Sequence, residues 1–331
     1  MKNIIFLDNS NIEFSGNDLN TMKVRGTESS MILLSEELVK KGFKVTVVNA
    51  INIPINVNGV EYTNKKVLDL NHIYDVAIAS SNANLFNGIN AKKKIVWSNS
   101  VQPVEKFLRK GQLIPFLKHK PIVVTMCDYQ YKLRSFITSF YGKDMISLTV
   151  DPKFYNEPID INYVPHKKAL YNIRSNRNLD WLLNIWINKI FPKDNSAELY
   201  ITSGLVDYTD VLKKSNIKLR SFGTRKELME ELKNTRVFTY IGHKSDIWTL
   251  AVEEARQLCV PVVTYGIGSI SDRVDHGNSG YVVKSDDEFA NTVINLMNDK
   301  NLYLKLKKNM FQNRGKLNWT SIADEWIRKH L

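Results

Sequence analysis

The sequence is poor in the features that mark secreted, disulfide-linked or membrane-spanning proteins. It contains only two cysteines, Cys127 and Cys259, and they lie far apart without metal-ligand spacing. This usage favours a reducing, cytoplasmic setting in which both thiols are buried. No apolar run approaches the roughly 20 residues that a transmembrane helix requires. The first residues, MKNIIFLDNSNIEF, have too short an apolar stretch for a signal peptide and no small-residue cleavage site, so we expect a first strand there.

Several catalytic and cofactor motifs are also missing. No glycine fingerprint for a dinucleotide follows the first expected strand. No Ser-His-Asp grouping can be proposed from spacing. The histidines show no metal-ligand spacing, and no carboxylate motif for a metal is present. We therefore expect neither a metal nor a bound cofactor, and we interpret most histidines as structural or exposed: His72, His119, His166, His243, His276 and His330.

Acidic residues are outnumbered by basic ones, 34 to 46, which gives a net charge of +12. Such a charge favours an anionic partner: a nucleic acid, an anionic membrane face or a phosphorylated small molecule. Short basic runs occur at 92–94, 118–120, 213–214 and 305–308. The simplest explanation is a set of solvated faces, and the functional alternative is adhesion to an anionic membrane surface. We expect no nucleic-acid partner, because no recognised motif accompanies the charge.

Alternation of apolar strands with amphipathic helices indicates an α/β protein. Its 331 residues suffice for two domains. A proline-bearing segment, 151–166, separates two series of buried strands that are typical of parallel sheets with helices on both faces. We predict two Rossmann-like domains, 1–160 and 161–312, whose parallel sheets face a central cleft, and a C-terminal helix, 313–331, that packs back on the first domain. The expected strands include Ile4–Leu7, Phe43–Val48, Ile95–Trp97, Lys168–Tyr171, Glu198–Thr202, Val237–Ile241 and Val260–Thr264.

The segment from Asp246 to Gly280 is the most informative one. It is expected to form a helix, a buried strand, a glycine-bearing turn and a second short helix. Asp246 and Glu254 would be about 12 Å apart if one helix spanned both, at about 1.5 Å per residue. That distance excludes a close acid–base pair and favours a grip on two ends of one extended ligand. The alternative is that the pair Glu253 and Glu254 lies on a solvated helix face.

Three loops add candidates for binding an anion. Gly26 is expected just before a helix, where free N–H groups favour negative charge; the alternative is a plain loop in which Gly26 is a turn residue and Thr27 the N-cap. Arg174 and Arg177 lie between a buried strand and a helix, and their planar guanidinium groups suit a diphosphate. Backbone N–H groups in the turn after the last strand could also meet phosphate. This turn contributes Gly266, Gly268 and Ser269, and His243 and Lys244 end the preceding strand.

These residues together resemble a known family, the retaining GT-B glycosyltransferases of family 4. The family pattern E-x7-E, G-x-P-V-V, a glycine pair and D-G-x-x-G is matched by Asp246-x7-Glu254, Cys259–Val263, Gly268-Ser269 and His276–Gly280. The family's N-terminal G-G-x-E appears as Arg25–Glu28, and its G-H-x-V-x-V as Gly42–Val47. Arg177–Asp180 is similar to the family's R-G-L-D segment.

The resemblance implies a retaining transferase that uses a UDP- or GDP-sugar and a glycan or lipid-linked acceptor, in the cytoplasm or on the inner face of a membrane. Arg174 and Arg177 would stabilise the leaving diphosphate, Asp246 would orient the donor sugar, and Glu254 would hold the ribose. The family often has a histidine after the strand that ends at Trp97, and Asn99 stands there instead. Gly26, His243, Gly268 and Ser269 complete the implied donor-binding set.

Three departures from the pattern leave alternatives open. Arg25 replaces a glycine, Asp246 is one methylene shorter than glutamate, and Asn99 cannot relay a proton. A catalytically degenerate sugar-nucleotide-binding or scaffold protein is therefore one alternative. A sugar-nucleotide epimerase is another, although no catalytic set for it can be assigned.

Overall fold

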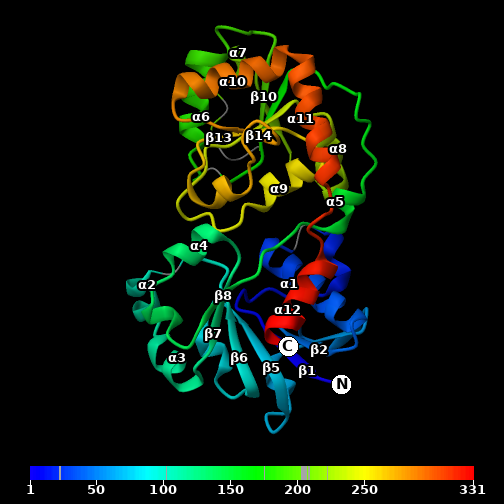
Figure 1. Cartoon of the computed structure of the whole chain (residues 1–331), viewed down its shortest axis with the longest axis vertical. Coiled ribbons are helices and arrows are strands. Elements are labelled where there is room, and N and C mark those ends of the chain that lie inside the picture. The colour runs from blue at the N-terminus through cyan, green and yellow to red at the C-terminus, as the bar shows by residue number, and fades with distance from the viewer. Residues whose placement is uncertain (22–23, 102, 175, 203–206, 208, 222) are drawn as a thin grey trace. The chain divides into compact units, whose positions relative to one another are not determined.

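The computed structural model describes residues 1–21, 24–101, 103–174, 176–202, 207, 209–221 and 223–331. The chain divides into two compact units. Unit 1 comprises Met1–Asp151 with Leu317–Leu331, and unit 2 comprises Pro152–Lys316. The predicted boundary after residue 160 therefore lies inside unit 2. Figure 1 shows the elements of both units along the chain.

Unit 1 is built on one sheet, which has eight strands among the described residues, in the order β3-β4-β2-β1-β5-β6-β7-β8. All neighbouring strands are parallel except β3 and β4, which are antiparallel. Asn58 and Gly59 join that pair, both with positive φ, as a two-residue hairpin turn requires. The strands are β1 (Asn3–Leu7), β2 (Lys44–Val48), β3 (Ile55–Val57), β4 (Val60–Thr63), β5 (Ile73–Ser80), β6 (Asn90–Trp97), β7 (Ile122–Thr125) and β8 (Lys143–Met145).

The helices of unit 1 include the last one of the chain, α12, which lies beside α1 (Figure 1). Trp326 is fully buried and meets Trp97 edge-on, with ring centroids 5.6 Å apart. The indole N–H of Trp319 donates to the Val150 carbonyl at 3.0 Å. The helices are α1 (Gly26–Lys40), α2 (Val104–Arg109), α3 (Leu113–His119), α4 (Asp128–Leu133) and α12 (Trp319–His330), with 3₁₀ turns η1 (Gly16–Asn20), η2 (Lys65–Val67), η3 (Ala83–Phe86) and η4 (Ile137–Ser139).

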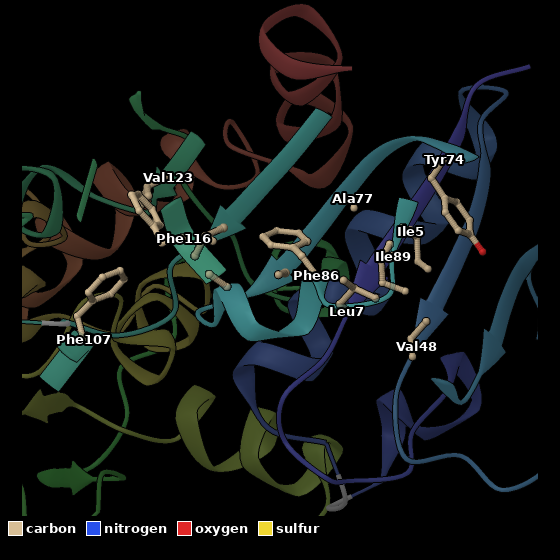
Figure 2. Close-up of a cluster of buried hydrophobic side chains, with 13 residues drawn as sticks. Ile5, Leu7, Val48, Tyr74, Ala77, Phe86, Ile89, Phe107, Phe116 and Val123 are labelled. Carbon is tan, nitrogen blue, oxygen red and sulfur yellow. The ribbon is translucent and has the colours of Figure 1, made fainter. Parts of the chain in front are cut away.

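The core of unit 1 extends from the sheet to the helices that follow β6. Figure 2 shows Ile5 and Leu7 of β1 near Ala77 of β5, and Phe86, Phe107 and Phe116 further along the same cluster. All of these side chains are almost completely buried. Continuous burial of the central strands is expected for a parallel sheet that helices cover on both faces.

Unit 2 contains the second sheet, with six strands among the described residues, in the order β11-β10-β9-β12-β13-β14, all parallel. The strands are β9 (Lys168–Tyr171), β10 (Glu198–Thr202), β11 (Ile217–Arg220), β12 (Val237–Thr239), β13 (Val262–Thr264) and β14 (Gly280–Val282). The helices are α5 (Pro152–Asn156), α6 (Leu179–Ile185), the π-helix η5 (Trp186–Ile190), α7 (Asp210–Lys214), α8 (Arg225–Lys233), α9 (Leu250–Gln257), the 3₁₀ turn η6 (Gly268–Asp272), α10 (Asp286–Asn298) and α11 (Lys300–Asn313). The prediction of two parallel α/β domains is confirmed.

Candidate functional site

The carboxyl end of β9 starts a loop whose backbone is held by a buried tyrosine. The hydroxyl of Tyr171 lies 2.8 Å from the carbonyl oxygen of Arg174 and 3.0 Å from that of Arg177. Asn178 adopts a left-handed conformation, and its side-chain amide donates to the Gly242 carbonyl at 2.8 Å. The loop after β9 is therefore tied to the loop after β12. Ser175, part of the predicted arginine loop, lies outside the described residues.

Arg177, His243 and Asp246 meet at this carboxyl edge of the second sheet. The Arg177 Nε lies 3.6 Å from a carboxylate oxygen of Asp246, and its Nη1 contacts Nδ1 of His243. Asp246 also accepts a hydrogen bond from the hydroxyl of Tyr240. Both charged side chains are largely buried, at 20% and 11% exposed, so the pair is only weakly screened by solvent.

The pKa of the Asp246 carboxyl lies above its usual value, because burial penalises the charged form more than Arg177 and Tyr240 stabilise it. The pKa of the Tyr240 phenol is raised as well, first by burial and then by the neighbouring Asp246 charge. The tyrosine therefore remains a hydrogen-bond donor, and it fixes the direction of the carboxylate.

The tautomer of His243 follows from its neighbours. Its Nδ1 receives the backbone N–H of Ser245 at 3.0 Å and faces a guanidinium nitrogen of Arg177, so Nδ1 is the acceptor. This assignment leaves Nε2 to carry the ring proton. His243 can then offer an N–H to a ligand.

The side chain of Arg174 differs from that of Arg177 in having no partner among the described residues. Its side chain is exposed, and it makes no hydrogen bond or ion pair within the described part of the chain. An unpaired guanidinium at the carboxyl edge of a parallel sheet is available to an anionic ligand.

Gly268 packs directly against the turn that carries His243 and Asp246. It has φ +80°, and a Cβ at this position would lie 2.2 Å from the His243 carbonyl oxygen. The Ser269 N–H donates to the Asp246 carbonyl at 3.1 Å, and Ser269 is completely buried. The predicted phosphate contact from the Ser269 N–H is therefore wrong for this structure, because that group already closes the turn. Gly268 and Ser269 instead pack against the backbone of His243 and Asp246 and hold their turn in place.

Asp246 and Glu254 do not share a helix, so the distance expected for one helix spanning both does not apply. α9 begins at Leu250 with Thr249 as its N-cap, because Asp246 belongs to the preceding turn. Glu254 is half-buried on the first turns of α9. The adjacent Glu253 is not on a solvated face: it is 7% exposed and accepts a hydrogen bond from the Gln257 amide at 2.8 Å.

Gly26 and Asn99, the remaining predicted residues, belong to unit 1. Gly26 is the first residue of α1, and Arg25 is the N-cap, so the alternative with Thr27 as N-cap is wrong. Asn99 follows β6, and its side-chain amide donates to Ser80 Oγ at 2.8 Å. Its side-chain carbonyl oxygen is buried and has no partner within the described residues.

Arg134 lies near Asn99 in the fold, and sequence reasoning missed it. Its side chain is 7% exposed, and its Nη1 donates to the Ser98 hydroxyl at 3.3 Å. Its Nε has no partner, and no carboxylate of the described residues pairs with it. Burial lowers the pKa of Arg134 to about 10. A lone arginine in a polar helix carries no sequence signal for such burial.

Two further observations concern metals and membranes. No group of three His, Cys, Asp or Glu side chains in the described ranges is arranged to hold a metal ion. Among the same residues, no helix combines the length and apolar character needed to cross a bilayer.

Comparison with known families matches one model, "Glycosyl transferases group 1", over residues 169–299. That range lies in unit 2 and includes Arg174, Arg177, His243, Asp246 and Glu254. A comparison with curated proteins finds no match.

Solved structures resemble this chain over most or nearly all of its length. Sucrose-phosphate synthase from Thermosynechococcus elongatus is 13% identical with a TM-score of 0.73, over 99% of this chain and 98% of that one. Anabaena Alr3699/HepE in complex with UDP and glucose is 14% identical with a TM-score of 0.69, over 99% of each chain. Staphylococcus aureus TarM is 17% identical with a TM-score of 0.61, over 76% of this chain and 54% of that one. This chain therefore spans about half the length of TarM. At such identities the likeness establishes the fold, which is GT-B.

Proposed function

We propose that the protein is a glycosyltransferase that moves a sugar from a UDP- or GDP-sugar to a glycan or lipid-linked acceptor with retention of anomeric configuration. The observation that carries the proposal is the Arg177–Asp246–His243 cluster at the carboxyl edge of the second sheet, inside the segment that matches the glycosyltransferase model. Ligands of open α/β sheets bind at this edge. The Anabaena neighbour, whose structure contains UDP and glucose, supports the choice of donor class.

In this proposal unit 2 holds the donor. Arg174 and Arg177 bind the diphosphate, and Glu254 on α9 accepts hydrogen bonds from the ribose. Asp246 orients the sugar, with its carboxylate held by Tyr240. The Nε2–H of His243 is a further donor toward the sugar or the phosphate. The charges are held in place because Arg177 and Asp246 contact each other.

The transfer breaks the bond between the anomeric carbon and the diphosphate oxygen. A new bond forms from the acceptor oxygen to the same face of that carbon. The acceptor proton passes to the leaving diphosphate, so no enzymic nucleophile is required. Arg174 and Arg177 stabilise the negative charge that develops on the diphosphate.

Unit 1 holds the acceptor in this proposal. Asn99 follows β6, at the carboxyl end of that strand, and Gly26, at the start of α1, keeps its place in the proposed donor-binding set. The carbonyl oxygen of Asn99, which has no partner within the described part of the chain, would accept a hydrogen bond from a sugar hydroxyl. We also propose a peripheral location on an anionic membrane surface, which suits a lipid-linked acceptor and the net charge of +12.

Isothermal titration of the full chain with UDP- and GDP-sugars tests the donor assignment. At least one donor should bind, and Arg174→Ala should weaken that binding about tenfold, since an exposed charged contact is lost. Lys305→Ala, which removes an exposed cation on α11, is the control and should bind normally. Failure of every donor to bind the folded protein would refute the proposal.

Turnover separates the remaining alternatives. Release of free nucleotide only when acceptor is present indicates transfer, whereas donor isomerisation without release indicates an epimerase. Donor binding without turnover across an acceptor panel indicates a degenerate binding protein. The anomeric configuration of the product, measured by NMR, tests retention.

A further inference from the structure

The exposed apolar side chains of this protein are concentrated in one segment. Of the eighteen large hydrophobic side chains that are exposed among the described residues, eight lie between residues 108 and 140, about a tenth of the chain. We call these the apolar face: Leu108, Ile114, Leu117, Tyr131, Leu133, Phe136, Ile137 and Phe140. They belong to α2, α3, α4 and the segment around η4.

Aromatic contacts join this face to the core of unit 1. Phe136 packs edge-on against Phe140 at 5.8 Å, and Phe140 packs against Tyr141 at 5.2 Å. Tyr141 in turn meets Phe116 at 5.5 Å, and Phe116 meets Phe107 at 5.4 Å. Phe107 and Phe116 are buried in the cluster that Figure 2 shows. The outermost rings are therefore anchored by packing and do not belong to a loose tail.

Several side chains of the face project far into solvent. Ile114 is 78% exposed, Phe136 75% and Phe140 59%. Most of the apolar surface of these three side chains stays in water, so folding gains little from it. Large apolar side chains exposed together in one segment are typical of surfaces that bind another partner or a membrane.

Positive charge surrounds the same face. Residues 104–143 contain eight lysines and arginines and two acids, so their net charge is 8 − 2 = +6, half of the +12 of the whole chain. Arg109, Lys110, Lys118, Lys120 and Lys132 are exposed. Protein interfaces are depleted of lysine, whereas anionic lipid surfaces attract it.

We infer that the apolar face and its exposed cations dock unit 1 onto an anionic lipid bilayer. Phe136, Phe140 and Ile114 enter the boundary between headgroups and acyl chains, and the lysines contact lipid phosphates. The short helices α2 and α3 lie on the membrane and do not cross it. The inference deepens the proposed function by naming its membrane-facing surface, but its binding test needs neither donor nor acceptor.

Sedimentation of the full chain with vesicles tests the inference. Vesicles of phosphatidylcholine with phosphatidylglycerol should bind the protein, and vesicles of phosphatidylcholine alone should bind it much less. The double substitution Phe136→Ser with Phe140→Ser should lower the partition coefficient about tenfold or more, because the two rings that insert into the bilayer are lost. Lys118→Glu with Lys120→Glu should lower it on anionic vesicles, and added salt should weaken binding by the unchanged chain.

The matched control is Ile53→Ser with Ile73→Ser. These side chains are 78% and 61% exposed, close to the values for Phe136 and Phe140, but lie outside the apolar face. Their partition should stay within about twofold of the unchanged chain. Circular dichroism establishes that each variant is folded.

Two results would overturn the inference. One is equal vesicle binding by the Phe136/Phe140 variant and the control variant. The other is no vesicle binding together with self-association, measured by analytical ultracentrifugation, that the same phenylalanine substitutions abolish. The second result would assign the face to a contact between copies of this chain. Donor binding measured by titration stands apart from both, so either proposal can fail alone.

Discussion

The carboxyl edges of the two sheets present opposite kinds of polar chemistry. At the edge of unit 2, an arginine, an aspartate, a histidine and a tyrosine contact one another around Asp246. At the edge of unit 1, hydroxyl and amide groups surround Asn99, and Arg134 is buried without a carboxylate. The largely buried Arg177 of unit 2 is paired with a carboxylate, whereas the buried Arg134 of unit 1 has no carboxylate partner among the described residues.

This contrast suggests that the two edges bind different kinds of ligand. Paired charges in unit 2 are held in place before a ligand arrives, which suits the stabilisation of a leaving diphosphate. A buried and uncompensated guanidinium in unit 1 lowers stability, and such a cost is common where a ligand supplies the missing partner. Substitutions at each edge, compared with control substitutions elsewhere in the chain, test this difference.

The largest expected effect is on the turn behind the Arg177–Asp246 pair. Gly268→Ala should reduce the free energy of unfolding by about 3 to 4 kcal/mol, because its Cβ would overlap the His243 carbonyl oxygen. Gly277→Ala is the control: its φ of +79° matches the +80° of Gly268, but nothing lies within 4 Å of its Cβ. Gly277→Ala should reduce the free energy of unfolding, measured by chemical denaturation, by about 1 kcal/mol. Equal losses would show that the turn accommodates a methyl group.

The next effect is on donor binding at the paired edge. Arg177→Ala should raise the dissociation constant of the donor about 100-fold, or about 2.7 kcal/mol, because a positive charge is lost and Asp246 is left buried alone. Titration calorimetry measures the change. Unchanged affinity would place the diphosphate elsewhere.

A smaller effect is the pH dependence of the same pair. As pH falls through the raised pKa of Asp246, the carboxyl becomes neutral and loses its attraction for Arg177. Donor affinity should therefore decline at acidic pH, beginning above the usual value of an aspartate. Asp246→Asn should remove that pH dependence.

The pH dependence of folding stability has the opposite sign to that of donor affinity. A raised pKa in the folded state favours the neutral carboxyl, so this contribution to stability is present at low pH and is lost as pH rises through the folded pKa. Asp246→Asn should then be no less stable than the unchanged chain at neutral pH, by thermal denaturation. A variant that keeps the pH dependence of donor binding would assign it to another group.

The smallest effect concerns the unbalanced arginine of unit 1. Arg134→Met should raise the free energy of unfolding by about 1 kcal/mol, because an unpaired buried charge is replaced by an apolar side chain. Arg236→Met is the contrasting variant. Arg236 is 2% exposed, and its three nitrogens donate to the carbonyl oxygens of Leu296, Pro165 and Met297. Its loss should destabilise unit 2 by about 2 to 3 kcal/mol, since those carbonyl groups lose their partners.

Thermal and urea unfolding of both variants give the comparison. A loss of stability in Arg134→Met as large as that in Arg236→Met would mean that Arg134 is a structural residue.

Much of the architecture could be predicted because strand and helix periodicities are local. The runs at Ile4–Leu7, Lys168–Tyr171 and Glu198–Thr202 are strands as predicted. The β3–β4 hairpin was missed, although Asn58-Gly59 is a strong signal for its turn. The condition that one helix spans Asp246 and Glu254 is not met, since the Asp246 turn is closed by the distant Ser269 N–H. No local pattern contains that hydrogen bond.

The sequence by itself determined the α/β class, the basic charge and the identity of the arginines, carboxylates and glycines near the strand ends, because these depend on composition and short-range spacing. The tertiary structure alone decided which of them meet. It paired Arg177 with Asp246 and His243, and it left Arg174 in solvent. It buried Arg134 with no carboxylate partner among the described residues, and it exposed Ile114, Phe136 and Phe140 on the apolar face. Such pairings and exposures depend on contacts between residues far apart in the chain, and burial then sets the strength of each charge.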